Sequence, residues 1–273
     1  MPITCKSPAE LEKMWAANQV VCRVLDEIGR MVAPGVTTGD IGELAAQAVR
    51  RYGVTSAFLG YGDPPFPAVA CVSVNDEVVH GIPSRKRVLN DGDVVSVDFG
   101  VEREGYFGDS ARTFAVGTID AEAQRLLAVT AASLERAIEQ CVVGRRVRDI
   151  SRAVQSHVEA EGFSVVRVFV GHGIGRRMHE DPPVPNYVGE GRNPRLKEGM
   201  VLAIEPMVNA GQPEVKVDRD RWTARARDGS LSAHFEHSVA ITRSGPWVLS
   251  RYDGRFETKE AGHEGPRLSS QNL

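Results

Sequence analysis

Two aspartates, Asp98 and Asp109, lie inside apolar segments that are typical of two neighbouring strands. If Arg103 and Glu104 form a two-residue turn, Asp98 lies directly opposite Asp109, and a turn displaced by one residue leaves the two as diagonal neighbours. Opposed side chains on one face of a hairpin have β-carbons about 5 Å apart. Carboxylates that close repel each other unless a proton or a cation lies between them. The hairpin therefore predicts a divalent metal site, with a solvated strand face as the plain alternative.

A glycine-rich segment, residues 168–181, carries two histidines. His172 lies between two glycines, and His179 follows a few residues later. The glycines let the backbone approach another group closely. Prolines arrive too soon for the helix that a dinucleotide-binding motif requires. Together with His80, which also precedes a glycine, these histidines favour a ligand or catalytic role over isolated core or surface positions.

Two further carboxylates interrupt apolar runs. Glu205 lies within residues 200–208 and Glu236 within residues 231–242. A carboxylate in an apolar strand is costly unless it is paired. Added to the two aspartates, the glutamates give four negative charges, which would balance two divalent cations. One imidazole completes a mixed nitrogen and oxygen ligand set, and His172 is the best candidate.

Helix and strand signals define the elements that must position these residues. Ser7, Pro8 and Glu10 form a helix start, and Thr37 with Asp40 forms a second. The pattern predicts helices over residues 8–31, 38–51, 120–141 and 147–162, and strands over 68–79, 93–101, 106–116, 164–170, 200–208 and 231–242. Within the hairpin, Val95, Val97 and Phe99 are expected to face a core. Helix pairs followed by antiparallel strands predict an α+β fold.

A shift of 109 residues relates the second predicted helix to the fourth. It superposes five identical residues in the 19 positions from 35 to 53: Gly35 on Gly144, Asp40 on Asp149, Ile41 on Ile150, Val49 on Val158 and Gly53 on Gly162. Recurring helix-entry and helix-exit signals are the plain alternative. A duplication predicts one domain with two pseudo-symmetric halves.

Composition narrows the class of protein. The chain has 273 residues, a formal net charge of −3 and four cysteines without a Cys-x-x-Cys pair. Scattered cysteines are typical of reduced thiols in a cytosolic protein. The slight acidity argues against a specific nucleic-acid ligand, and no apolar run is long enough to span a bilayer. We therefore expect a cytoplasmic protein without a membrane segment.

These residues together resemble the type I methionine aminopeptidases, over about residues 5–252. The resemblance is carried by CVSVNDEVVHG at 71–81, Asp98, Asp109, GHGIG at 171–175, His179, IEPM at 204–207 and Glu236-His237. It implies the pita-bread fold, with halves at about 1–116 and 117–258 in one catalytic domain. The segment 259–273 is expected to be a flexible tail. The lack of a zinc-finger extension or a long insertion before Glu205 resembles the short bacterial form.

The resemblance also implies a site. Its metal ligands would be Asp98, Asp109, His172, Glu205 and Glu236, with Asp109 and Glu236 bridging two divalent ions (Co, Mn, Fe, Zn or Ni). A hydroxide held by both metals would attack the scissile carbonyl. Glu205 would shuttle the proton, His179 would stabilise the oxyanion, and His80 would contact the scissile amide.

The same resemblance implies a methionine pocket and a second cation. The substrate-binding residues would be His80, His179, Cys71, Phe66, Met178 and Trp222, and Met178 stands where family members commonly have phenylalanine. A monovalent cation would lie near Asn75 and Ser232. The implied substrate is the N-terminal methionine of nascent polypeptides whose second residue is small.

The expected partners follow from that substrate. They are nascent chains and the ribosome exit region, for an enzyme expected to be a monomer. Two alternatives stay open. One is another pita-bread peptidase, such as an Xaa-Pro aminopeptidase or prolidase. The other is a non-catalytic pita-bread protein that binds RNA or ribosomes.

Overall fold

A computed structural model describes residues 2–252 of the chain. The predicted domain end at 258 and the predicted tail, 259–273, lie outside the described residues. Among the described helices, none combines the length and apolar character needed to cross a lipid bilayer.

In the described part of the chain, four helices form where the sequence predicts them. They are α1 (Pro8–Met31), α2 (Thr38–Tyr52), α3 (Ala121–Ile138) and α4 (Val147–Ala160). Ser7 and Thr37 cap α1 and α2 with complete capping boxes, in which Glu10 and Asp40 bind back to the cap amides. Reciprocal bonds of this kind satisfy amides that a helix start leaves unpaired. Only the C-terminal end of α3 differs from its predicted position by more than two residues: the helix ends at Ile138, three residues before Cys141.

Within residues 2–252 the strands form four antiparallel sheets. The first half builds the four-stranded sheet of β1 (Thr55–Ser56), β2 (Cys71–Val74), β4 (Val94–Arg103) and β5 (Tyr106–Ala115). The second half builds the five-stranded sheet of β7 (Gly171–Gly173), β8 (Glu180–Val184), β9 (Val201–Ile204), β14 (His237–Thr242) and β15 (Gly245–Val248). Two three-stranded sheets complete the fold: β6 (Ser164–Val165), β10 (Met207–Asn209) and β13 (Ser232–His234), and β3 (Glu77–Val79), β11 (Val215–Val217) and β12 (Ala224–Ala226).

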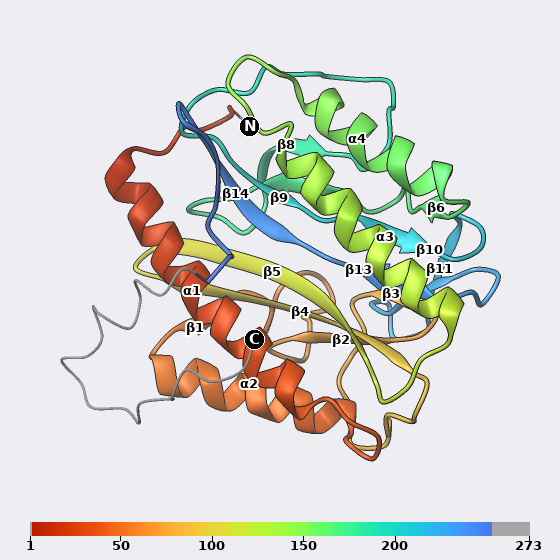
Figure 1. Ribbon diagram of the computed structural model, residues 1–273. Helices are drawn as coiled ribbons and strands as arrows, with labels where there is room; N and C mark the ends of the chain where they lie inside the picture. Colours follow the sequence, from red (N-terminus) through yellow and green to blue (C-terminus); the bar gives the residue numbers. More distant parts are fainter. Residues whose placement is uncertain (1, 253–273) are drawn as a thin grey trace, which may run out of the picture.

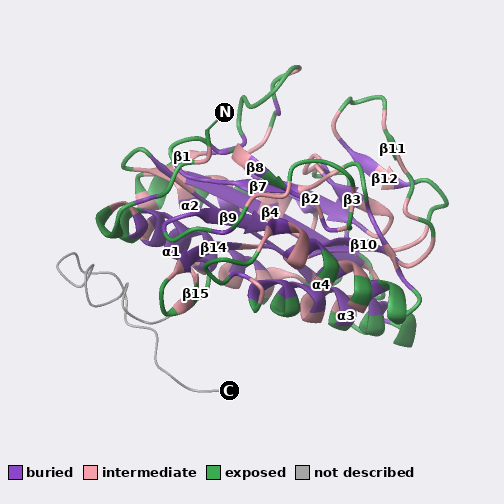
Figure 2. Ribbon diagram, turned by 90° about the horizontal axis from the view of Figure 1, so that it is seen from above, coloured by how far each residue is buried: buried purple, intermediate pink, exposed green. Residues whose placement is uncertain are grey.

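Each pair of helices packs on the strands of its own half. Helices α1 and α2 contact β2, β4 and β5, whereas α3 and α4 contact β6, β8, β9, β10 and β13. Figure 1 shows β5 and β14 in the middle of the molecule, where the two halves meet. In Figure 2 the strands are largely buried, and the exposed residues of α3 and α4 lie on their outer side.

The two halves repeat local details that the sequence shift predicts. Gly35 and Gly144, which the sequence shift aligns, have φ angles of +92° and +91°. The amide of Gly35 donates to the carbonyl oxygen of Leu89 at 2.8 Å, and the amide of Gly144 donates to that of Leu196 at 3.0 Å. Glycine adopts this left-handed conformation without strain. The duplication thus appears in the structure as pseudo-twofold halves of two helices followed by antiparallel strands.

Three predicted strands are broken in the structure. Residues 68–79 divide into β2 and β3 at Asn75, whose φ is +59°. Residues 200–208 divide at Glu205 and Pro206, and residues 231–242 divide at Phe235 and Glu236. At both glutamates the chain passes between the five-stranded sheet and the sheet of β10 and β13. The prediction of a carboxylate in the middle of one continuous strand was therefore wrong, because each glutamate lies where the chain changes sheet.

The glycine segment also differs from its prediction. Only Ser164 and Val165 of the predicted strand 164–170 pair as a strand, and the glycines themselves form β7. A β-carbon on Gly171 would lie 2.4 Å from the carbonyl oxygen of Ala203, and one on Gly173 would lie 2.3 Å from that of Asp181. Only glycine permits the backbones to approach so closely, so these residues let β7 lie between β8 and β9.

Candidate metal centre and substrate pocket

The turn of the acidic hairpin lies one residue further along the chain than predicted, so the register differs by two residues and Asp98 pairs with Ala111. Across the hairpin, Asp109 pairs with Gly100, two residues from Asp98, so the two aspartates are diagonal neighbours. The turn is Glu104 and Gly105, with φ angles of +52° and +80°. Two positive φ angles are typical of a type I′ hairpin turn, which favours glycine at its second position. The prediction that Asp98 lies directly opposite Asp109 was therefore wrong, and the predicted alternative, a diagonal pair, is observed.

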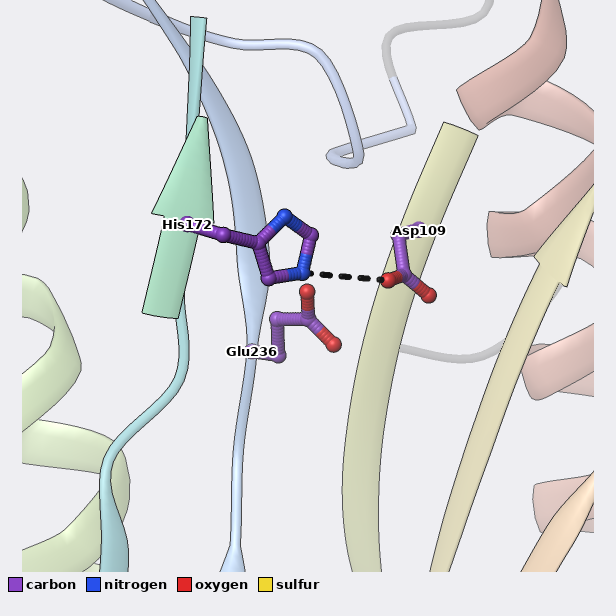
Figure 3. A group of neighbouring side chains, drawn as sticks. All are labelled: Asp109, His172 and Glu236. Atoms are coloured by element: carbon purple, nitrogen blue, oxygen red, sulfur yellow. Dashed lines mark ion pairs between the residues drawn. The ribbon is translucent and has the colours of Figure 1, made fainter. Parts of the chain in front are cut away.

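Three side chains that lie far apart in the sequence converge on one point. Asp109 comes from β5, His172 from β7, and Glu236 immediately precedes β14. Figure 3 shows them pointing toward one another, and one ligand atom from each lies within 4.8 Å of the others. The Nε2 atom of His172 is 4.0 Å from Oδ2 of Asp109 and 3.6 Å from Oε1 of Glu205. Asp98 lines a cavity together with these residues.

The ring of His172 is oriented for metal binding. Its Nδ1 lies 2.9 Å from the carbonyl oxygen of Gly173. A carbonyl only accepts hydrogen bonds, so Nδ1 carries the proton and Nε2 presents a lone pair to the carboxylates. A backbone partner of this kind fixes the tautomer of a ligating histidine.

The strands that carry the two predicted bridging carboxylates are joined by reciprocal hydroxyl bonds. Ser110 donates to the carbonyl oxygen of Glu236 at 2.5 Å, and Ser238 donates to that of Asp109 at 2.9 Å. The amide of Glu236 also donates to the carbonyl oxygen of Ala111 at 2.9 Å. These bonds connect β5 of the first half with β14 of the second and fix the spacing of the two carboxylates.

The carboxylates of the cluster lack the counter-charges that burial requires. Burial, together with the charges of Glu236 and Asp98, raises the pKa of Asp109 well above its usual value. Burial also raises the pKa of Glu205 and of Glu236, with further contributions from neighbouring carboxylates, and it raises the pKa of Asp98 to about 7. One buried oxygen each of Asp98, Asp109 and Glu236 has no hydrogen-bond partner. Unpaired buried oxygens beside an imidazole nitrogen fit a divalent cation, which accepts this mixed ligand set.

Metal binding is expected to release protons. At pH 7 the raised pKa values keep protons on the metal-free cluster, and a cation must displace them because it binds carboxylates. Isothermal titration of chelator-treated protein with Mn²⁺, in buffers of different ionisation enthalpy, measures this release. We expect release of about one proton or more and an affinity that rises with pH. Asp98→Asn should release fewer protons, and a binding enthalpy that is the same in every buffer would contradict the prediction.

All eleven residues predicted for the site line one cavity of about 240 Å³. They are Phe66, Cys71, His80, Asp98, Asp109, His172, Met178, His179, Glu205, Trp222 and Glu236. The acidic cluster lies beside an apolar wall that includes the buried side chains of Phe66, Cys71 and Met178. Aromatic and sulfur-containing side chains suit an unbranched thioether side chain.

Trp222 is held in this wall by contacts from a distant loop. Its indole Nε1 donates to the carbonyl oxygen of Pro64 at 3.1 Å, and its ring lies edge-on to Phe66 at 5.1 Å. A β-carbon on Gly62 would lie 2.6 Å from the indole ring. The loop before Cys71 therefore needs a glycine at this position to admit the tryptophan.

Two histidines face the cavity without belonging to the acidic cluster. His80 lies edge-on to the rings of Trp222 and Phe169, at 5.8 and 5.2 Å. Burial, with the nearby His179, lowers the pKa of His80 to about 4, so its ring is neutral at pH 7. The ring of His179 lies 4.2 Å from that of His172, and loss of solvent lowers the pKa of His179.

Three residues at the site escaped the sequence analysis. The hydroxyl of Tyr61 lies 2.7 Å from Nδ1 of His179, and Phe58 also lines the cavity. His234 is buried, with its Nε2 atom 3.9 Å from Oε2 of Glu205 and without a hydrogen-bond partner. The position of His234 two residues before Glu236 could have indicated its place at the site. The loop of Tyr61 has no hydrophobic period that would indicate which way its side chain points.

Asn75 and Ser232, predicted near a monovalent cation, are adjacent. The amide of Ser232 donates to the carbonyl oxygen of Asn75 at 2.9 Å. The side chain of Asn75 binds Asp93 and the amide of Val94. Next to Ser232, Asn209 has a buried side-chain oxygen without a partner.

Comparison with known proteins defines the class. The model of metallopeptidase family M24 matches residues 12–243, so the chain belongs to this family of metallopeptidases. Within it, the resemblance to type I methionine aminopeptidases is confirmed. A methionine aminopeptidase of Clostridium acetobutylicum is 49% identical over 248 residues, which cover 91% of this chain and 98% of the relative. The crystal structure of a methionine aminopeptidase from Thermotoga maritima has a TM-score of 0.89 and 43% identity, covering 92% of this chain and all of that one.

A more distant structure shows how far the fold extends. An Xaa-Pro dipeptidase from Bacillus anthracis has a TM-score of 0.73 at 21% identity, covering 91% of this chain and 62% of that one. At this identity the likeness concerns the fold alone. The predicted pita-bread α+β fold is confirmed, and it is shared by peptidases of different names.

Proposed function

We propose that the protein removes the N-terminal methionine of polypeptides by metal-dependent hydrolysis. One observation carries the proposal: a cluster of carboxylates and an imidazole shares a small cavity with an apolar wall. The cluster suits two divalent ions, and the wall suits a methionine side chain. The high identity to methionine aminopeptidases over nearly the whole chain supports the same function.

The ligand set that we propose is Asp98, Asp109, His172, Glu205 and Glu236, which would hold two divalent ions. Divalent ions held there supply a water of lowered pKa and polarise the carbonyl oxygen. The donor set accepts Co, Mn, Fe, Zn or Ni. The substrate's α-amino group would lie at the Asp98 side, which restricts cleavage to the first residue.

The protein's own side chains then divide the remaining work. Glu205 accepts the proton of the attacking water and passes it to the leaving amine. His179 donates from Nε2 to the developing oxyanion when its Nδ1 accepts the hydrogen of Tyr61, and the 2.7 Å contact supports this tautomer. His80, neutral and fixed between Trp222 and Phe169, contacts the scissile amide. Phe66, Cys71, Met178 and Trp222 surround the methionine side chain.

Finer parts of the proposal concern the setting of the enzyme. We include a monovalent cation near Asn75 and Ser232, which the unpaired buried oxygen of Asn209 supports. We also include small second residues, nascent chains at the ribosome exit region as substrates, and a cytoplasmic monomer that neither crosses membranes nor binds specific nucleic acid. The catalytic domain is proposed to extend to residue 258, with halves at about 1–116 and 117–258.

A peptidase assay on chelator-treated protein tests the function. Peptides beginning Met-Gly, Met-Lys and Xaa-Pro are offered, with divalent metals added back one at a time. We expect release of methionine from Met-Gly peptides alone, restored by metal, because a narrow site rejects the long lysine side chain. The metals that restore activity identify the usable ions.

Two outcomes would contradict the proposal. Cleavage of Xaa-Pro peptides in preference to Met-Gly peptides would place the activity with the related Xaa-Pro peptidases. No cleavage with any metal, in folded protein that binds metal, would favour the non-catalytic alternative and a search for an RNA or ribosomal ligand.

A further inference from the structure

One lysine ahead of α1 is buried among exposed neighbours. Only 9% of Lys6 is exposed, whereas Thr4, Cys5 and Ser7 are exposed residues. Lysine is almost never fully buried unless it is paired. The amide of Lys6 donates to the carbonyl oxygen of Gly199 at 2.6 Å, which fixes the segment against the second half of the molecule.

The partner of Lys6 is the residue that follows His179. The Nζ atom of Lys6 lies 2.7 Å from Oε2 of Glu180, and the two side chains are only 6% and 7% exposed. The hydroxyl of Thr4 donates to the same oxygen at 2.7 Å. Burial acts to raise the pKa of Glu180, but the hydrogen bonds from Lys6 and Thr4 outweigh it and the pKa is lowered. Glu180 is therefore a carboxylate at neutral pH.

The other oxygen of Glu180 closes the turn that carries His179. Its Oε1 accepts the amides of Arg176 and Arg177, at 2.9 and 3.2 Å. A β-carbon on the preceding Gly175 would lie 2.4 Å from Cε of Lys6 and 2.7 Å from Oε1 of Glu180. Glycine at this position lets the lysine pass beneath the turn and reach the carboxylate.

We infer that Lys6 is a positioning residue for His179. Lys6 does not line the cavity, but it holds Glu180, and Glu180 holds the turn between Gly175 and the histidine. The pair therefore sets where the His179 ring stands relative to the scissile carbonyl. This inference rests on the proposed function, in which His179 stabilises the oxyanion. Misplacing such a group by about 1 Å can lower a rate about 10²-fold.

Lys6→Met tests the inference, with Lys13→Met as the matched control on the exposed face of α1. The Lys13 side chain is 47% exposed and only 3.6 Å from Glu104, in a surface pair. We expect Lys6→Met to lower kcat on a Met-Gly peptide about tenfold or more, with KM and Mn²⁺ affinity within about threefold. Lys13→Met should change none of these. Thr4→Val removes a neutral donor to Glu180 without unpairing a charge, and it should show a smaller loss of kcat even if Lys6→Met folds poorly.

Two further measurements separate positioning from a general structural effect. In a His179→Ala background, Lys6→Met should lower kcat no further, because the group that it positions is already gone. An equal loss in both backgrounds would overturn the inference. Nitrogen-15 spectra of the histidine rings give a readout independent of turnover: the His179 signals should move in Lys6→Met but not in Lys13→Met. If wild-type protein releases no methionine, the proposed function fails, while unmoved His179 signals would overturn the positioning itself.

Discussion

Glu205→Ala is expected to abolish methionine release. The substitution removes a carboxylate 3.6 Å from the free nitrogen of His172, and with it both a proposed metal ligand and the proposed proton acceptor. The measurement is kcat on a Met-Gly peptide at saturating Mn²⁺, together with the number of ions bound in a calorimetric titration.

The control for this variant is Glu198→Ala. Glu198 is an exposed residue that pairs with Arg243 at 2.6 Å and does not line the cavity, and its loss should leave turnover unchanged. Appreciable turnover by Glu205→Ala with metal present would refute the role of Glu205 as proton shuttle. Glu205→Gln refines the result, since it preserves shape but cannot accept the proton.

His179→Ala is expected to lower kcat by about 10²–10³, the range for removal of one oxyanion donor. The effect should fall on kcat, because the donor acts mainly on charge that develops in the transition state. Binding of Mn²⁺ should stay close to wild type, since His179 is not in the proposed ligand set. Steady-state kinetics on a Met-Gly peptide, with calorimetric metal titration, provide both readouts.

A control substitution at another histidine distinguishes this result from a general loss of activity. His157→Ala changes a histidine on α4 that does not line the cavity, and it should leave kcat unchanged. Tyr61→Phe should give a smaller loss than His179→Ala, because it removes only the partner at Nδ1. A loss confined to KM in His179→Ala would argue against the oxyanion role.

The helices and the strand pairs were predictable because their signals are local. Capping boxes at Ser7 and Thr37 mark the starts of α1 and α2 within four residues of sequence. In the hairpin, the alternation of Val95, Val97 and Phe99 correctly predicted the face toward the core, where all three are fully buried. The turn was one residue out, and the register two, because hydrophobic alternation does not determine the turn, and the glycine at position 105 does.

The breaks in the long strands were not predictable in the same way. An apolar run such as residues 200–208 does not tell whether its two ends pair with one sheet or with two. In the structure β9 pairs with β7 and β14, whereas β10 pairs with β6 and β13. These partners lie far apart in the sequence, so only the assembled fold shows that Glu205 lies at the crossing.

In the candidate site, too, local sequence signals were predictive, whereas contacts between distant segments were not. The eleven predicted residues were identified by residue type, by spacing and by resemblance, and all of them line the cavity. Their supporting contacts were missed, since each joins distant segments: Tyr61 to His179, Lys6 to Glu180, and Ser110 to Glu236. Such contacts have no sequence period, because they depend on how the two halves dock.

The serine bonds between β5 and β14 also set an order for assembly during synthesis. Asp98 and Asp109 meet in a local hairpin, but the bonds of Ser110 and Ser238 join residues 126 and 129 positions apart. Glu236 therefore reaches the site only after nearly the whole described chain has left the ribosome. A chain still missing β14 holds the two aspartates without Glu236, so the cluster of Asp109, His172 and Glu236 is complete only late in synthesis. Under the proposed function, shorter chains that end before Glu236 would therefore release no methionine.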